Sequence, residues 1–230
     1  MFGLAPVHGP SMVLGKIGYL SEDRDLPTWM RIDQLMHYRS AFYPNWDHDY
    51  AKELVTMFDL VVHQRIRSLF RSQLARVGLL PAMAHRPELQ LLDEPCSGLD
   101  PVVRRDILAA IIRTAADDGR TVLFSSHLLD EVQRVRDHVA MLHGGQLLLC
   151  DRLEAVLTQN SRWTIRLPDR VQAAPDIPGS VRCRGEGHEW SVVCNGQHEQ
   201  FQRWLSEHNG KVIEQATPSL DEIFVARVGV

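Results

Sequence analysis

Apolar and polar segments alternate along the chain in a pattern that predicts a mixed α/β protein. Short continuous apolar runs at residues 16–20, 89–93 and 121–126 predict strands, because strands buried on both faces lose the polar alternation of half-exposed ones. Helical patterns at residues 72–85 and 102–118 separate the later runs. Strands that alternate with helices predict a parallel sheet.

Two further helices are predicted ahead of residue 70. The first spans about residues 30–42, and Pro44 follows it. The second spans about residues 47–60, where apolar residues recur at i, i+4, i+7 and i+8, one stripe of an amphipathic helix. The stripe consists of Tyr50, Leu54, Met57 and Phe58. We expect a small helical subdomain at about residues 30–85.

The pattern changes again near residue 150, which predicts two domains, residues 1–150 and 151–230. Segments 138–142 and 146–151 flank two glycines and predict an antiparallel hairpin at the edge of the first domain. The second domain is expected to be a small α+β module. Its predicted elements are strands at 162–168 and 211–216, a hairpin of 181–184 and 190–194 around "GEG", and a helix at 198–208.

Composition narrows the class of partner and the compartment. The 25 basic and 29 acidic residues give a net charge of -4 without a polybasic block, which disfavours a nucleic-acid partner. The four cysteines form no CxxC pair and suit reduced thiols in the cytoplasm. The central apolar run "VGLLPAMA" is far shorter than the roughly 18 residues of a membrane span, and the N-terminus does not resemble a signal peptide. We expect a cytoplasmic protein, at most peripheral at the membrane.

A zinc site is the alternative interpretation of one cysteine-containing segment. Cys183, His188, Cys194 and His198 lie within a short window and have the side chains that zinc prefers. Their spacing matches no common zinc finger. The predicted hairpin is therefore the favoured interpretation.

The candidate chemistry lies where two predicted strands end. Asp93 and Glu94 lie at the carboxyl end of the strand at 89–93, and Ser125, Ser126 and His127 lie at that end of the next one. Ligands of open α/β sheets bind beyond the carboxyl ends of the strands, so these side chains are expected to share one site. Adjacent carboxylates of this kind usually serve a metal-bound phosphate.

Longer segments at these strand ends resemble one known family. "LLDEPCSGLDP" followed by "TVLFSSHLLDEV" is similar to the Walker B strand, D-loop and switch histidine of ATP-binding-cassette (ABC) ATPases. "IGYLSEDRDLP" resembles their Q-loop region, and the closing "SLDEIFVARVG" resembles the cassette subunits of drug and antibiotic exporters. The resemblance covers essentially the whole chain. It implies a P-loop NTPase-like fold, ATP and Mg²⁺ as cofactors, and two partners, a membrane permease subunit and a second ATP-binding cassette.

The resemblance also implies roles for individual residues. Asp93 matches the Mg²⁺ ligand, Glu94 the general base that polarises the attacking water, and His127 the contact to the γ-phosphate. Glu22 takes the place of the glutamine that couples nucleotide state to the membrane subunit, and a glutamate there still binds Mg²⁺ or water. Ser97, Gly98 and Asp100 match the loop that crosses the dimer interface.

Two departures from the family pattern predict impaired catalysis. The Walker A loop has the form G-x-x-x-x-G-K-[ST], and its nearest match, Gly9–Ile17, has five residues between the glycines and isoleucine where the hydroxyl belongs. We therefore expect a truncated cassette that lacks this phosphate loop. The family signature LSGGQ aligns with Leu69, Phe70, Arg71, Ser72 and Gln73, so a phenylalanine replaces the serine and a serine replaces a glycine. Pro81 lies inside the helix that follows.

The resulting hypothesis is an exporter ATP-binding subunit by ancestry with weak or absent ATPase activity. One alternative is a non-catalytic cassette that gives structural or regulatory contacts to an intact partner in a heterodimer. Another is the product of a disrupted or mis-started gene.

Overall fold

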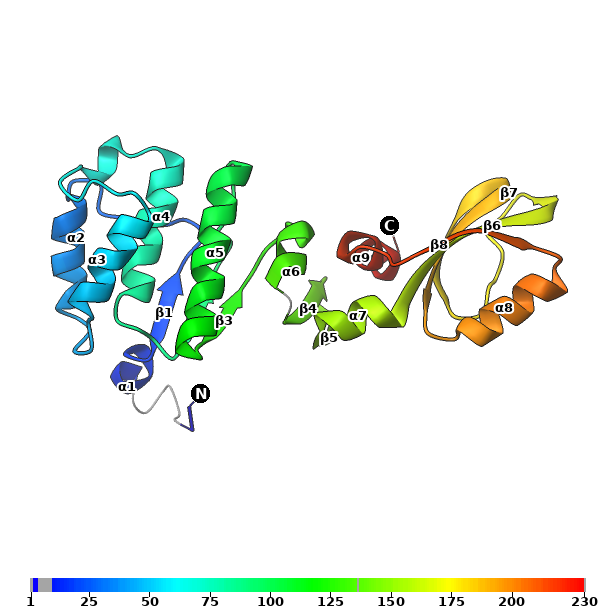
Figure 1. Cartoon of the computed structure of the whole chain (residues 1–230), viewed down its shortest axis with the longest axis horizontal. Helices are drawn as coiled ribbons and strands as arrows, with labels where there is room; N and C mark the ends of the chain where they lie inside the picture. The colour runs from blue at the N-terminus through cyan, green and yellow to red at the C-terminus, as the bar shows by residue number, and fades with distance from the viewer. Residues whose placement is uncertain (1, 4–9, 136, 230) are drawn as a thin grey trace. The chain divides into compact units, whose positions relative to one another are not determined.

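The structure, a computed structural model, describes residues 2–3, 10–135 and 137–229. The chain divides into two units, Met1–His127 and Leu128–Val230, coloured blue to green and green to red in Figure 1. Gly9, the first glycine of the near match to a phosphate loop, lies outside the described residues.

A parallel sheet forms the centre of the first unit. It consists of β1 (Ile17–Leu20), β2 (Leu89–Leu92) and β3 (Thr121–Phe124) in the order β1-β2-β3. The three predicted strands and their parallel arrangement are thus confirmed. Because all three run in the same direction, the residues after them emerge at one edge of the sheet.

Six helical segments accompany this sheet within the described residues, and the four helices predicted from the sequence pattern are among them. The six segments are α1 (Pro10–Leu14), α2 (Ile32–Ser40), α3 (His48–Met57), η1 (Ile66–Ser68), α4 (Arg71–Met83) and α5 (Pro101–Asp118). The apolar faces of α2, α3, η1, α4 and α5 share one core, in which Leu35 of α2, Leu54 of α3 and Leu79 of α4 are fully buried. The predicted stripe of the second helix is therefore a packing face.

Helix α4 packs very closely on β1. A Cβ atom added to Gly18 would lie 1.9 Å from the carbonyl oxygen of Ala82, so only glycine permits this approach. Pro81 does not end α4, which continues to Met83. The close contact fixes α4 against the strand that leads into the Q-loop-like segment.

One row of apolar side chains on this sheet is open. Tyr19, Leu91 and Leu123 are register partners across β1, β2 and β3. Tyr19 is 62% exposed and Leu123 is 63% exposed. Large apolar groups arranged side by side on a surface favour association with another surface.

A hairpin and three helices form one part of the second unit. Strands β4 (His138–His143) and β5 (Gln146–Arg152) pair antiparallel, as predicted. Their core includes residues of α7 (Leu153–Gln159) and α9 (Leu220–Val228), and α6 (Leu129–Val135) packs against it. The sequence pattern placed this hairpin in the first domain; the structure groups it with the C-terminal unit.

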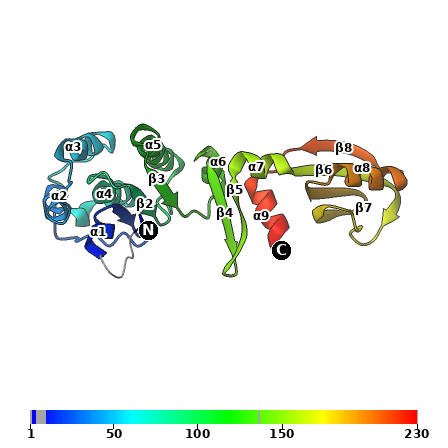
Figure 2. The same cartoon turned by 90° about the horizontal axis from the view of Figure 1, so that it is seen from below.

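An antiparallel sheet forms the other part of the second unit (Figure 2). Its order is β7-β6-β8, with β6 (Asn160–Val171), β7 (Ser180–Asn195) and β8 (Lys211–Ala216), and α8 (His198–Glu207) contributes Phe201 to its core. Both segments of the predicted hairpin lie in β7. Within β7 the chain folds back on itself, which brings Gly185 so near to Glu189 that an added Cβ would lie 2.2 Å from the Glu189 carbonyl oxygen.

The cysteines of β7 are held as neutral thiols. Burial raises the pKa of Cys183 to about 11 and that of Cys194 to about 12. Metal ligation by cysteine needs the thiolate. Across the described residues, no group of three or more histidine, cysteine or acidic side chains is arranged to hold a metal ion.

Candidate functional site

The carboxyl edge of the β1-β2-β3 sheet brings the predicted acidic and hydroxyl groups together. The Asp93 amide donates to the carbonyl oxygen of Leu20 at 2.8 Å, and the Ser125 amide donates to that of Leu92 at 3.0 Å. Sheet-like bonding therefore continues past the ends of the strands. The expected convergence of the two strand ends is present in the structure.

Ser125 connects the two acidic residues. Its Oγ donates to Asp93 Oδ1 at 2.7 Å and accepts from the Glu94 amide at 2.8 Å. A hydroxyl group both donates and accepts, so Ser125 sets the distance between a carboxylate and the backbone beside it. The second carboxylate oxygen of Asp93 takes no part in this contact.

Glu94 and His127 form a close pair. His127 Nδ1 lies 2.8 Å from Glu94 Oε2, and the glutamate side chain is only 17% exposed whereas the histidine is 62% exposed. An ionised carboxylate only accepts hydrogen bonds, so Nδ1 carries the proton in this contact. The opposite ring nitrogen, Nε2, is then the atom with which His127 can meet a ligand.

The backbone at Glu94 is strained. Its φ angle is +44°, in the left-handed region that residues with a side chain rarely adopt. Such strain is common at functional sites and persists only where surrounding contacts hold it. Ser125 is one such contact, through the Glu94 amide.

The loop after Glu94 returns the chain to α5. The Ser97 amide donates to the carbonyl oxygen of Glu94 at 3.1 Å, and Gly98 has a φ angle of +66°. Asp100 accepts from the amides of Val102 and Val103 and caps α5. In this chain Asp100 therefore has a structural part as a helix cap, and its part at a dimer interface stays a prediction.

The signature-aligned residues lie at the N-terminus of α4. Leu69 is buried, and Phe70 is 77% exposed. The Phe70 amide donates to Gln73 Oε1 at 3.0 Å, so the glutamine caps the helix. Arg71 lies against Gly98, because a Cβ at that glycine would be 2.2 Å from the arginine Cζ. Ser72 is half-buried in the first turn. A helix N-terminus favours anions.

Glu22 and Arg24 lie in the turn after β1. Glu22 is exposed. Arg24 Nη2 donates to the carbonyl oxygens of Glu94 at 3.3 Å, Pro95 at 3.0 Å and Ser97 at 3.5 Å. Burial lowers the pKa of Arg24, the charge of Arg71 acts in the same direction, and Glu22 opposes both. No function was expected for Arg24 from the sequence, where its position two residues after Glu22 was the available signal.

The donor set fits one part of a Mg·ATP site. Mg²⁺ prefers oxygen ligands and is usually held by one or two carboxylates together with substrate phosphates. Asp93 supplies a carboxylate at the sheet edge, and Glu22 follows the neighbouring strand. No triad of metal-ligating side chains occurs in the described part of the chain, so the phosphates would have to supply most of the remaining ligands.

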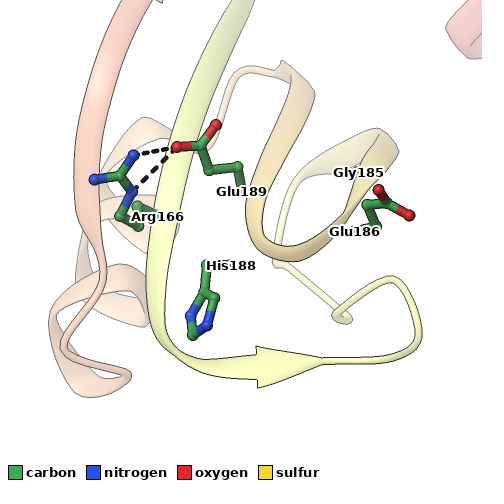
Figure 3. Close-up of a pocket in the computed structure, with 5 residues that line it drawn as sticks. All are labelled: Arg166, Gly185, Glu186, His188 and Glu189. Carbon is green, nitrogen blue, oxygen red and sulfur yellow. Dashed lines mark hydrogen bonds and ion pairs between the residues drawn. The ribbon is translucent and has the colours of Figure 1, made fainter.

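A hollow in the second unit has polar walls (Figure 3). It is lined by Arg166, Gly185, Glu186, His188 and Glu189. Arg166 and Glu189 form an ion pair, and His188 Nδ1 lies 3.1 Å from the carbonyl oxygen of Leu167. Three of its polar side chains thus bond within the chain, which favours a structural part for this hollow.

No family model matches the chain. Sequence relatives nevertheless align with most of it. An uncharacterised ABC transporter ATP-binding protein from Synechocystis sp. is 26% identical over 222 residues, which cover 93% of this chain and 62% of the relative. The ABC transporter ATP-binding protein YtrB from Bacillus subtilis is 26% identical over 85% of this chain and 67% of YtrB. The bacitracin transport ATP-binding protein BcrA from Bacillus licheniformis is 37% identical over 98 residues, 43% of this chain and 28% of BcrA.

Solved structures match the fold. The ATP-binding subunit of an ABC transporter superimposes with a TM-score of 0.62 at 22% identity and covers 69% of this chain and 68% of its own. A dimeric ATP-binding cassette in a post-hydrolysis state, bound to ADP and Pi, gives a TM-score of 0.57 at 19% identity over 66% of this chain and 68% of that chain. No helix in the described residues is long and apolar enough to cross a bilayer. The chain spans under two thirds of the Synechocystis relative. It is similar in sequence to ABC transporter ATP-binding proteins, bacitracin-transport proteins among them, and it has the mixed α/β ABC ATPase fold.

Proposed function

We propose that this chain is the ATP-binding subunit of an ABC-type export system. The observation that carries the proposal is the network of Asp93, Ser125, Glu94 and His127 at the carboxyl edge of the parallel sheet. The similarity to bacitracin transport ATP-binding proteins supports a transport function, and the resemblance of the closing "SLDEIFVARVG" to exporter cassette subunits supports export as the direction. Its partners are then a membrane permease subunit and a second ATP-binding cassette, and its place is the cytoplasmic face of the membrane.

Each residue of the network has a distinct part in this proposal. Asp93 and Glu22 give oxygen ligands to Mg²⁺, which neutralises phosphate charge when it is bound. Glu94 accepts the proton of the attacking water through Oε1, since Oε2 already contacts His127. His127 orients that carboxylate through Nδ1 and presents Nε2 to the phosphate side of the site.

We further propose that these 230 residues bind ATP weakly and hydrolyse it poorly. None of the described residues forms the glycine-rich cradle that normally surrounds the phosphates. The signature position has Phe70, which lacks a hydrogen-bond donor, and Ser72 has a side chain where close approach to phosphate favours glycine. Residues 1–150 are the proposed nucleotide-binding domain, with residues 151–230 as an accessory module.

A non-catalytic cassette partner is the second candidate. The exposed phenylalanine at the start of α4 favours it, because an aromatic side chain suits a protein contact better than a phosphate contact. In this case the chain gives structural or regulatory contacts to an intact cassette. A disrupted or mis-started gene would leave the same residues without their function.

Nuclear magnetic resonance distinguishes these proposals. In a titration with millimolar Mg·ATP, the amide signals of Asp93, Glu94 and Ser125 should shift, whereas titration with Mg²⁺ alone should shift them less. The matched control is Asp106, an acidic residue of α5 paired with Arg76, whose signal should stay in place. Unmoved signals at the sheet edge would refute the nucleotide site, and a low-micromolar dissociation constant would refute the proposed weakness.

A further inference from the structure

Arg24 occupies a junction between three parts of the first unit. It closes a tight turn directly after β1, where its amide donates to the carbonyl oxygen of Ser21 at 3.2 Å. Its Cγ lies 4.0 Å from the position that a Cβ of Gly78 would take, so the aliphatic part of the side chain runs over α4. The guanidinium then reaches the loop after β2.

The guanidinium binds the backbone of that loop. One nitrogen, Nη2, is within 3.5 Å of three carbonyl oxygens, those of Glu94, Pro95 and Ser97. These carbonyls belong to the segment that carries the strained φ angle of Glu94. Hydrogen bonds from a charged donor are stronger than those from a neutral one, so Arg24 is well suited to hold this conformation.

We propose that Arg24 is a positioning residue for Glu94. It fixes the backbone from which the Glu94 carboxylate extends towards His127, and it connects that backbone to the turn that carries Glu22. A movement of this turn would therefore shift Glu94. The inference rests on the proposed function for its catalytic meaning, but the backbone contact itself is independent of nucleotide.

Two ordinary explanations for a half-buried arginine do not account for this geometry. A surface ion pair would place the guanidinium on a carboxylate, yet the three hydrogen bonds of Arg24 Nη2 all go to carbonyl oxygens. A packing role alone would need only the methylene groups over Gly78. The burial and the charge of Arg71 that lower its pKa are both unfavourable, and the carbonyl bonds oppose them together with the charge of Glu22.

Amide hydrogen exchange of the nucleotide-free protein tests the inference. In Arg24→Gln, the Glu94 and Ser97 amides should exchange about tenfold faster or more, because local opening no longer breaks a charge-assisted bond. Arg24→Lys keeps the charge but not the planar fork. Its exchange rates should fall between those of Arg24→Gln and those of the unsubstituted protein. Should the glutamine variant fail to fold, the lysine variant decides the question by the same readout.

Arg76→Gln is the matched control. Arg76 also donates to a carbonyl oxygen of the same unit, that of Phe58 at 3.3 Å, which does not belong to the loop after β2. In Arg76→Gln, the exchange rates of the Glu94 and Ser97 amides should stay within twofold of those in the unsubstituted protein. Equal acceleration in the Arg24 and Arg76 variants, or unchanged exchange in Arg24→Gln, would overturn the inference.

The two levels of the proposal can fail separately. If the protein hydrolyses ATP, Arg24→Gln should lower kcat severalfold with little change in KM, and Arg24→Lys should restore part of it. A loss confined to KM would overturn the positioning part. An unsubstituted protein without nucleotide binding would refute the proposed function, and the exchange measurement would still decide whether Arg24 holds Glu94.

Discussion

Replacement of Gly18 by alanine should strongly destabilise the first unit. The added Cβ would lie 1.9 Å from the carbonyl oxygen of Ala82, whereas real contacts of this kind are at least 3.0 Å long, so α4 and β1 would have to separate by 3.0 − 1.9 = 1.1 Å. The carbonyl group of Ala82 is backbone within α4 and cannot rotate away, and Pro87 Cγ would also lie only 2.9 Å from the added Cβ. Overpacking in a well-packed core costs about 3 kcal/mol at this severity, a large share of the roughly 5–15 kcal/mol that stabilises a domain.

Gly78→Ala is a matched control at the same interface. Its Cβ would lie 3.0 Å from Leu20 Cδ1, the end of a flexible side chain. The gain of about 1 kcal/mol from replacing a helical glycine should offset the displacement of this methyl group. We expect the stability of Gly78→Ala to remain within about 1 kcal/mol of the original.

Hydrogen exchange of core amides in α4, monitored as urea is added, reports the unfolding of the first unit in both variants. A probe within this unit is needed because the two units can unfold separately. Gly18→Ala should lower the midpoint clearly and Gly78→Ala should not. A Gly18→Ala protein as stable as Gly78→Ala would refute the reasoning. It would mean that α4 does not lie on β1 as closely as described.

Three further predictions concern single groups. Ser125→Ala should cost about 1 kcal/mol, since water can replace the hydroxyl only in part; thermal unfolding measures this, and an unchanged melting temperature would contradict it. Asp100→Ala should cost about 1 kcal/mol through loss of the α5 cap, whereas Asp100→Asn should largely retain it in the same assay. The half-buried thiol of Cys183 and the buried thiol of Cys194 should alkylate slowly at mildly alkaline pH, and the exposed thiol of Cys150 quickly. The pKa values of Cys183 and Cys194 rise to about 11 and about 12 in the folded state. The two neutral thiols therefore stabilise the fold below the ordinary pKa of 9.0, and this stabilisation is lost as the pH rises from 9.0 through the folded-state values. Equal alkylation rates for the three cysteines would contradict the burial.

The sequence pattern was sufficient for most elements of the first unit. Apolar runs without polar alternation identified β1, β2 and β3, although one face of this sheet carries the exposed Tyr19 and Leu123. Because parallel strands share one carboxyl edge, the residues at the strand ends were predicted to lie together. These residues are Asp93, Glu94, Ser125 and His127. These predictions needed only local patterns and one topological rule.

Contacts between distant segments could not be predicted from the sequence pattern. The bonds from Arg24 to the loop near Glu94 join residues about 70 positions apart, and nothing in "EDRDLP" indicates their direction. Similarly, the hairpin of β4 and β5 was predicted correctly, but its packing with α7 and α9 depends on apolar residues far apart in the chain. Long-range packing of this kind decides where a compact unit ends.

Phosphate release by a fusion protein tests the central claim most directly. The Walker A segment of an intact cassette, fused ahead of Met1, should restore nucleotide binding but little hydrolysis. Phe70→Ser with Ser72→Gly should then raise phosphate release, and Glu94→Gln in this repaired protein should abolish release while binding is retained. Release that survives Glu94→Gln would contradict the assignment of the general base, and equal release before and after the signature repair would contradict the claim that the signature is defective.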